Sequence, residues 1–253
     1  MTSEEKRYSR LRWQVFLSAT IGYGIYYVCR LSLNVVKKPL VDSGALTETE
    51  LGIVGSALFI TYAVGKFVNG FLADRVNIRR FMSIGLLVVA IVNLLLGFKL
   101  SSGLFIVLWA INGWAQSMGA PPAVISLSRW FSLKTRGTYY SMVCSTPYLG
   151  KALSLIMIGG VVAAVGWQWG FIFAAIAGVI GAFIIFLFVS DTPESKGLPS
   201  VQELSGEKPA KSDSLPTKEL QGLVVRHPGI WIIALSCYFV YITQYGLSNW
   251  GVL

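Results

Sequence analysis

The sequence has little charge and only one histidine. Asp, Glu, Lys and Arg make up 13% of its 253 residues, whereas they make up about a quarter of a soluble domain. Hydrophobic residues make up 54%, and the mean hydropathy is +0.63. This composition excludes an ordinary soluble domain and indicates a membrane protein with several spans. The net charge of +9 does not indicate nucleic-acid binding, because no soluble basic face presents it.

Groupings that support enzyme chemistry are also missing from the sequence. The three cysteines, Cys29, Cys144 and Cys237, lie far apart in apolar stretches, which excludes disulfide or metal spacing. The sequence has no paired carboxylates of a catalytic site, no metal-ligand cluster and no glycine-rich phosphate loop after a strand. We therefore expect no enzymatic activity, no cofactor and no metal.

Seven apolar runs are long enough to span a bilayer, which takes about 20 mostly apolar residues. They cover residues 13–36, 51–73, 81–98, 102–126, 138–165, 168–189 and 229–253. Residues 190–228 are rich in proline and mixed charge, which predicts a polar connector. The expected organisation is an N-terminal tail (1–12), a six-helix half (13–189), a linker (190–228) and a seventh span (229–253).

Lysine and arginine lie mostly on one side of this expected membrane. The tail, the second-to-third loop, the fourth-to-fifth loop and the linker hold 15 of the 21, and the opposite side holds Lys37, Lys38 and Lys99. Because positive loops stay in the cytoplasm, we expect a plasma (inner) membrane protein with a cytoplasmic N-terminus and linker. Six spans and a cytoplasmic linker are typical of the first half of a twelve-helix transporter. We expect the chain to be truncated relative to twelve helices, with a C-terminal half missing.

Three cations lie inside the apolar runs, whereas all 12 acidic residues and His227 lie outside them. Arg30 is deep in the first run, where a charge is costly and usually faces a cavity or a partner. With no carboxylate in the runs to neutralise Arg30, an anionic ligand is favoured over a snorkelling side chain. Lys66 lies nearer the membrane surface, so a snorkelling side chain is a stronger alternative to ligand binding for this residue. Lys151 lies near the middle of the fifth run.

Polar uncharged side chains accompany these cations. Tyr23, Tyr26 and Tyr27 share the helix face of Arg30 and can donate to phosphate or sugar oxygens. An aromatic belt or core packing explains each tyrosine equally well. Gln116 and Asn112 lie one turn apart on the fourth span, where hydrogen bonds between helices are favoured over a substrate contact.

Five segments resemble the organophosphate:phosphate antiporters of the major facilitator superfamily, including hexose-phosphate and glycerol-3-phosphate transporters and hexose-phosphate sensors. They are Gly22–Arg30, Gly70–Arg80, Gly113–Pro122, Asp191–Pro199 and Asn249–Gly251. The resemblance implies an all-α bundle of the major facilitator type, with Arg30 as the first phosphate-binding arginine and Lys66 near the cavity. Gln244 replaces the family's second binding arginine. Lys151 replaces a glycine of the fifth-helix signature and could supply the lost positive charge.

The second-to-third loop carries a signature of this family. Gly70, Asp74, Arg75, Arg79 and Arg80 match it. We expect Asp74 and the three arginines to form a charge relay that locks the cytoplasmic face. Plain topogenic charge also explains the arginines, and it is the favoured interpretation of Arg129 and Arg136 in the fourth-to-fifth loop.

The leading functional expectation is exchange of a sugar phosphate or similar organophosphate for inorganic phosphate by alternating access. Two alternatives remain open, because Gln244 and the fifth-helix signature depart from the family pattern. One is a membrane receptor that binds external hexose phosphate and signals to a partner. The other is an inactive fragment of such a carrier.

The charge asymmetry predicts the topology. Cysteines introduced at Ser212, in the linker, and at Ser102, in the third-to-fourth loop, should react with an impermeant thiol reagent from opposite sides of the membrane. The linker position should label from the cytoplasm and Ser102 from outside. Labelling of both positions from one side would exclude the seven-span topology.

Overall fold

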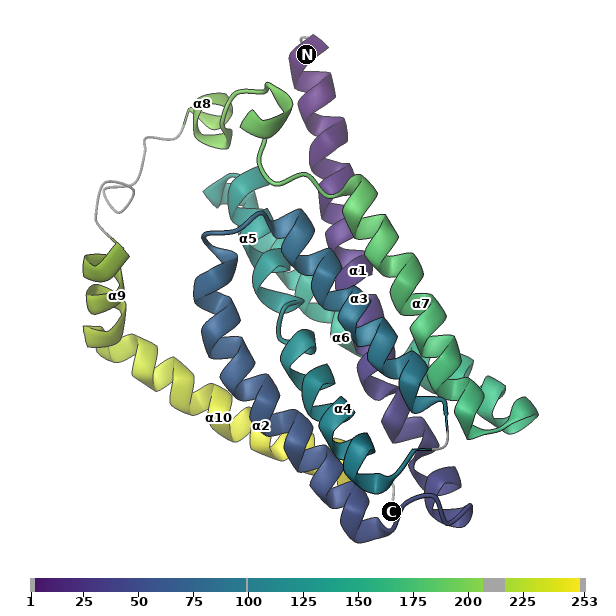
Figure 1. The fold of residues 1–253 in the computed structure, drawn as a ribbon. Coiled ribbons are helices and arrows are strands. Elements are labelled where there is room, and N and C mark those ends of the chain that lie inside the picture. Colours follow the sequence, from purple (N-terminus) through teal and green to yellow (C-terminus); the bar gives the residue numbers. More distant parts are fainter. Residues whose placement is uncertain (1–2, 99, 207–216, 251–253) are drawn as a thin grey trace. The chain divides into compact units, whose positions relative to one another are not determined.

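The structure, a computed structural model, describes residues 3–98, 100–206 and 217–250 (Figure 1). The chain divides into two units, Met1–Ser205 and Gly206–Leu253. Ser212 and the last residue of Asn249–Gly251 lie outside the described residues. The first unit contains α1 (Ser3–Asp42), α2 (Glu48–Ala73), α3 (Ile78–Leu96), α4 (Ser102–Gln116), α5 (Ala120–Trp130), α6 (Leu133–Val165), α7 (Trp167–Phe188), a 3-10 turn η1 (Glu194–Lys196) and α8 (Val201–Ser205). The second unit contains α9 (Thr217–Arg226) and α10 (Pro228–Trp250).

The helices follow the apolar runs, which confirms the all-α membrane fold. Four of them, α2, α3, α6 and α7, have the length and hydropathy needed to cross a membrane. The longer α1 contains the first run, whose Arg30 and three tyrosines lower its hydropathy. The fourth run is divided between α4 and α5, and Pro121 and Pro122 stand in the first turn of α5. Proline is tolerated there because the first-turn N–H groups have no partner within the helix.

The connection between α6 and α7 is shorter than the expected two residues. Gly166 alone separates Val165 from Trp167, with φ at 100° and ψ at 167°. Glycine adopts this positive φ without steric cost, whereas other residues are strained there. The two helices therefore reverse direction at a single residue.

Glycines allow the helices of the first unit to approach closely. A Cβ atom on Gly178 of α7 would lie 2.8 Å from the Cβ of Ala90 on α3. One on Gly113 of α4 would lie 2.5 Å from the carbonyl oxygen of Leu58 on α2. Small residues of this kind let membrane helices pack backbone to backbone. The contacts fix α3 against α7 and α2 against α4.

Buried polar side chains join the helices across these contacts. The Tyr26 hydroxyl donates to the Met82 carbonyl at 2.7 Å, which links α1 to α3. Ser32 donates to Asn93 at 2.8 Å between the same helices, and Asn69 donates to Ser117 at 2.6 Å between α2 and the end of α4. Burying a polar group without a partner is costly. These bonds therefore fix the rotation of α1 and α2 within the unit.

Large apolar side chains cover the outward faces of α2 and α6. Ile60 and Phe67 on α2 are 65% and 71% exposed, and Ile156 on α6 is 73% exposed. Such contiguous apolar surface is unstable in water and suits a lipid bilayer or further membrane helices.

Candidate functional site

Arg30 lies on α1, and its side chain reaches α2. The residue is 8% exposed. Its guanidinium carbon lies 4.2 Å from the ring centroid of Tyr62 and 5.7 Å from that of Phe59. Phe59 and Tyr62 are three residues apart, so both rings lie on one face of α2. The guanidinium is therefore held against aromatic faces.

Lys66, which lies on α2 like Tyr62, also contacts the Tyr62 ring. Its Nζ lies 5.3 Å from the Tyr62 centroid, and the residue is exposed. Lys66 follows Tyr62 by four residues, one helical turn, which places both on one face of α2. The structure thus brings two of the three membrane cations to one aromatic side chain. Sequence reasoning missed Tyr62, although its spacing from Lys66 was a usable signal.

Tyr23 and Tyr27 extend this group along α1. Their rings meet edge to face with centroids 5.4 Å apart, and their hydroxyl oxygens are 3.4 Å apart. Tyr23 also interacts electrostatically with Tyr62 and Arg30. We call the set Tyr23, Tyr27, Arg30, Phe59, Tyr62 and Lys66 the cationic cluster. Tyr26 is not part of it, because Tyr26 is 1% exposed and bonded to α3.

Gln116 makes the inter-helix bond that the sequence favoured. Its Nε2 donates to the backbone carbonyl of Tyr26 at 3.1 Å, and the residue is 5% exposed. The contact joins α4 to α1 one turn before Arg30. Gln116 therefore supports the backbone of α1 in this structure.

Lys151 is half-buried on α6. Its Nζ lies 5.9 Å from the ring centroid of Tyr148, on the same helix. The preceding residue, Gly150, is packed against α1, since a Cβ there would lie 2.8 Å from the Cβ of Tyr27. Lys151 is thus next to the α1–α6 contact. Gln244, the other residue of the expected charge exchange, belongs to α10 in the second unit.

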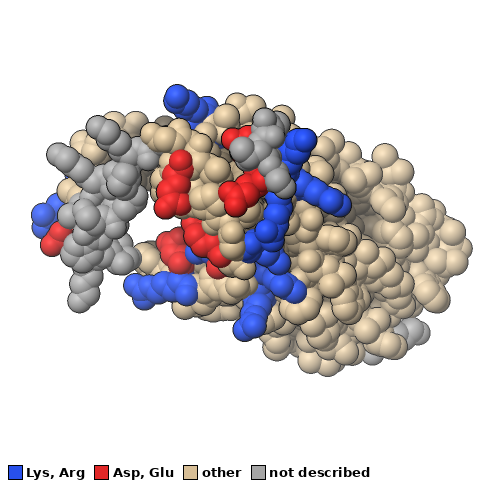
Figure 2. All heavy atoms as spheres, turned by 90° about the horizontal axis from the view of Figure 1, so that it is seen from above, with Lys and Arg blue, Asp and Glu red and all other residues tan. Residues whose placement is uncertain are grey.

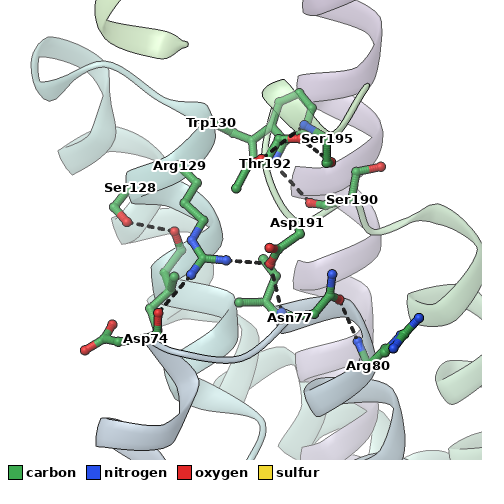
Figure 3. Close-up of polar contacts among 12 residues, drawn as sticks. Asp74, Asn77, Arg80, Ser128, Arg129, Trp130, Ser190, Asp191, Thr192 and Ser195 are labelled. Atoms are coloured by element: carbon green, nitrogen blue, oxygen red, sulfur yellow. Dashed lines mark hydrogen bonds and ion pairs between the residues drawn. The ribbon is translucent and has the colours of Figure 1, made fainter. Parts of the chain in front are cut away.

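The polar contacts at the loop end of the bundle differ from the expected relay (Figure 3). The central ion pair joins Arg129, at the end of α5, to Asp191, just after α7. Asp191 also accepts the backbone N–H of Ile78 at 2.9 Å, at the start of α3. Asp74 contributes its backbone carbonyl, 3.3 Å from Arg129 Nη2, and its carboxylate points away in Figure 3.

The remaining residues of the loop signature have other contacts. The Arg79 guanidinium carbon lies 4.3 Å from the ring centroid of Phe186 on α7. The N–H of Arg80 donates to the Asn77 side chain at 3.2 Å, which caps α3. Arg75 is exposed, and the space beside Gly70 is open. Figure 2 views this end of the molecule and shows Lys and Arg gathered beside Asp and Glu.

Trp130 connects three segments at the same end. Its Nε1 donates to the Ser190 carbonyl at 3.1 Å, and its own carbonyl accepts from the Tyr8 hydroxyl at 2.8 Å. Burial raises the pKa of Tyr8, so the hydroxyl stays protonated and can donate at any physiological pH. The start of α1, the end of α5 and the segment after α7 are therefore tied together.

The sequence profile of the Major Facilitator Superfamily matches residues 19–253. The chain belongs to this superfamily. The all-helical fold of the chain is thus a major facilitator fold. Its relatives include transporters and a sensor.

Several curated relatives are identical to this major facilitator chain at about a third of the aligned positions. A glycerol-3-phosphate transporter of Bacillus subtilis is 37% identical, over 96% of this chain and 57% of its own length. A probable hexose phosphate transport protein of Chlamydia trachomatis and the membrane sensor protein UhpC of Salmonella typhimurium are each 31% identical, over 98% of this chain and 58% of their own length. The chain thus spans a little over half the length of these relatives.

Solved structures agree with this fold. A bacterial homologue of the human lysosomal transporter Spinster, inward-facing and unoccupied, matches with a TM-score of 0.70 at 19% identity. The match covers 95% of this chain and 55% of that one. A peptide transporter in complex with sulfate matches with a TM-score of 0.57 at 15% identity, over 96% and 47% of the two chains.

The Asp191 contacts predict a difference between two aspartates of the loop end. Asp191→Ala should lower the free energy of unfolding by about 1–2 kcal/mol, because Arg129 and the N–H of Ile78 lose their acceptor. Asp74→Ala, the matched control, should change it far less, since its carboxylate points away from Arg129. Thermal unfolding in detergent measures both. Equal losses from the two substitutions would contradict the central place of Asp191.

Proposed function

We propose that the chain is the first part of a secondary transporter that exchanges a sugar phosphate or related organophosphate for inorganic phosphate by alternating access. The observation that carries the proposal is the cationic cluster, where Arg30 and Lys66 lie within 4.2 and 5.3 Å of one tyrosine ring. Their charges have no carboxylate within the apolar runs to balance them. An anionic substrate is the species that such a site favours.

The aromatic contacts hold Arg30 in place without cancelling its charge. A cation–π contact contributes about 0.5–2 kcal/mol and does not neutralise the charge of the guanidinium. A bidentate pair with a phosphoryl group is charge-assisted and stronger. The planar fork of arginine matches two phosphate oxygens, and lysine supplies a second point charge. Arg30 is therefore the proposed phosphoryl ligand, and Lys66 the second cation.

The remaining polar groups of the cluster suit the rest of a phosphorylated sugar. Tyr23 and Tyr27 have hydroxyl groups that can donate or accept, one helical turn from each other. Lys151 is proposed to provide a further positive charge from α6, and Gln244 is proposed to contact the substrate in the whole carrier. Gln116 is left with a supporting role, because its amide already bonds to α1.

The loop end is proposed to be the cytoplasmic gate. Arg129 and Asp191 close the contact between the ends of α3, α5 and α7, and Asp74, Arg75, Arg79 and Arg80 surround it. This assignment places the N-terminus (1–12) and the linker (190–228) in the cytoplasm and the protein in the plasma membrane. The six-helix half (13–189) and the seventh span (229–253) would pair with a C-terminal half like that of the longer relatives.

A sensor is the second candidate function. The relative UhpC is named a membrane sensor protein. Gln244 in place of an arginine would weaken transport chemistry while leaving the cationic cluster intact. A receptor would bind external hexose phosphate at that cluster and pass the signal to a partner protein. Counterflow of labelled phosphate in liposomes distinguishes the two, because a sensor binds the ligand without exchanging it.

The proposed phosphoryl ligand predicts the effect of a conservative substitution. Arg30→Lys keeps the charge but loses the bidentate fork, so the affinity for glycerol 3-phosphate or glucose 6-phosphate should fall by about 10- to 100-fold. Isothermal titration or radioligand binding on the whole protein measures it. Arg10→Lys, at an exposed position of the N-terminal tail, is the control and should leave affinity unchanged. Unaltered affinity in a folded Arg30→Lys protein would make Arg30 a structural anchor and end the site assignment.

A second prediction tests whether Lys151 on α6 supplies the positive charge that the family's arginine would supply at the position of Gln244. Lys151→Gly should weaken anion binding, because Lys151 is proposed to add positive charge to that of Arg30 and Lys66 against the doubly charged phosphate monoester. Adding Gln244→Arg should then restore part of it, because a new cation would serve the same ligand from α10. Binding of inorganic phosphate to both variants, in a carrier with both halves, is the measurement. Full binding by Lys151→Gly would place Lys151 outside the site.

A further inference from the structure

The start of α1 carries a stripe of exposed apolar side chains. Trp13, Leu17 and Ile21 follow one another at intervals of one helical turn and are 41%, 50% and 50% exposed. The next residue, Gly22, is packed against α7, since a Cβ there would lie 2.5 Å from the Ile185 side chain. The stripe therefore runs from the loop end into the first apolar run, beside the contact between α1 and α7.

Aromatic rings from two apolar runs meet at the head of this stripe. Trp13 is the first residue of the first run, and Tyr139 is the second residue of the fifth. Their rings lie edge to face with centroids 5.6 Å apart, and Tyr139 also packs against Phe16 at 5.1 Å and Phe131 at 4.1 Å. Tryptophan and tyrosine favour the boundary between the hydrocarbon core and the lipid headgroups. Trp13 and Tyr139 therefore mark the level of the headgroups on this side of the bundle.

Arg12, one residue outside the first run, is held beside these rings. Its guanidinium carbon lies 5.3 Å from the ring centroid of Phe131 and 5.9 Å from that of Tyr8. The side chain is half-buried, and its Nε has no hydrogen-bond partner among the residues that the structure describes. Glu194 and Arg12 both act electrostatically on the Tyr8 hydroxyl, but no ion pair joins Arg12 to a carboxylate in the described chain. Its positive charge thus lies at the headgroup level without a negative partner.

A second arginine adds positive charge at the same place. Arg136 precedes Tyr139 by three residues, so the two share a face of α6. Its Nη2 donates to the carbonyl oxygens of Ser128 and Phe131, at 3.1 Å each. Carbonyl groups carry no net charge, so these bonds hold the guanidinium without neutralising it. Arg12 and Arg136 therefore both lie beside Phe131 with their charges unbalanced.

We propose that Arg12 and the apolar stripe of α1 bind an anionic phospholipid. The headgroup phosphate pairs with the Arg12 guanidinium, and one acyl chain lies along Leu17 and Ile21. A phospholipid matches this surface better than a soluble anion does, because the cation stands at the headgroup level and the exposed apolar side chains continue from it into the bilayer. Basic positions between membrane helices bind anionic headgroups in this way.

This lipid site lies apart from the cationic cluster. Arg30 follows Arg12 by 18 residues, which is about 27 Å along a helix that rises about 1.5 Å per residue. The inference therefore goes beyond the proposed function and does not depend on it.

Thermal unfolding of the whole protein in lipid nanodiscs tests the site. Adding phosphatidylglycerol to phosphatidylcholine should raise the melting temperature by about 2–4 °C. Arg12→Gln should remove this rise. Lys6→Gln, which removes the same charge from an exposed position on α1, is the matched control and should keep it. No rise in the unaltered protein, or an equal loss in the two variants, would overturn the inference, because general charge attraction explains an equal loss.

Inorganic phosphate distinguishes a lipid site from a site for free anions. In nanodiscs of phosphatidylcholine alone, any stabilisation by phosphate should be the same in the unaltered protein and in Arg12→Gln, because the cationic cluster is intact in both. Stabilisation by phosphate that Arg12→Gln removes would make Arg12 a ligand of soluble anions and overturn the lipid assignment.

A second measurement does not require a variant of Arg12. Phosphatidylglycerol with brominated acyl chains should quench the fluorescence of Trp13, obtained as the difference between the unaltered protein and Trp13→Phe. Brominated phosphatidylcholine at the same fraction should quench it less. Equal quenching by the two lipids, or no quenching by either, would contradict an anionic lipid on the stripe.

Discussion

The structure depends on how positive charge is held inside a membrane without negative charge beside it. Arg30, Lys66 and Lys151 lie in apolar runs from which every carboxylate is excluded. The ring of Tyr62 lies beside the cationic groups of Arg30 and Lys66, and the ring of Tyr148 lies beside that of Lys151. An aromatic face attracts a cation but carries no net charge. The cluster is therefore stabilised while its field remains positive, which a site for an anion requires.

The packing of α1 makes this arrangement rigid. Tyr26 and Gln116 bond through side chain or backbone to the neighbouring helices, and Gly178 lets α7 approach within contact of α3. Because these contacts lie within one or two turns of Arg30, they fix the depth and rotation of its Cα. The buried polar residues and the glycines of α1, α4 and α7 thus help to hold Arg30 in position, although none of them carries charge.

Much of the fold followed from the sequence, because length and hydropathy are local properties. The all-α fold and the inter-helix use of Gln116 could be predicted from short windows. The spacing of Tyr62 from Lys66 is a local signal, but its contact with Arg30 depends on the register of α2 against α1 and could not be predicted in this way. The Arg129–Asp191 pair joins positions 62 residues apart in the chain. Sequence reasoning favoured plain topogenic charge at Arg129 and expected Asp74 to pair with Arg75, Arg79 and Arg80, because no local pattern marks an acidic partner that follows α7.

The loop end and the cationic cluster differ in how their positive charge is balanced, and this difference bears on function. At the loop end, Arg129 meets the carboxylate of Asp191, and Arg79 lies on Phe186 beside solvent. Charge there is neutralised within the protein and serves to hold helix ends together. In the cationic cluster the protein supplies aromatic rings and hydroxyl groups, but no anion from its apolar runs. A structural use of Arg30 would be better served by one aspartate in those runs. Under the proposed function, a substrate anion would supply the negative charge that these runs lack, and its release would leave the cluster ready for the next anion.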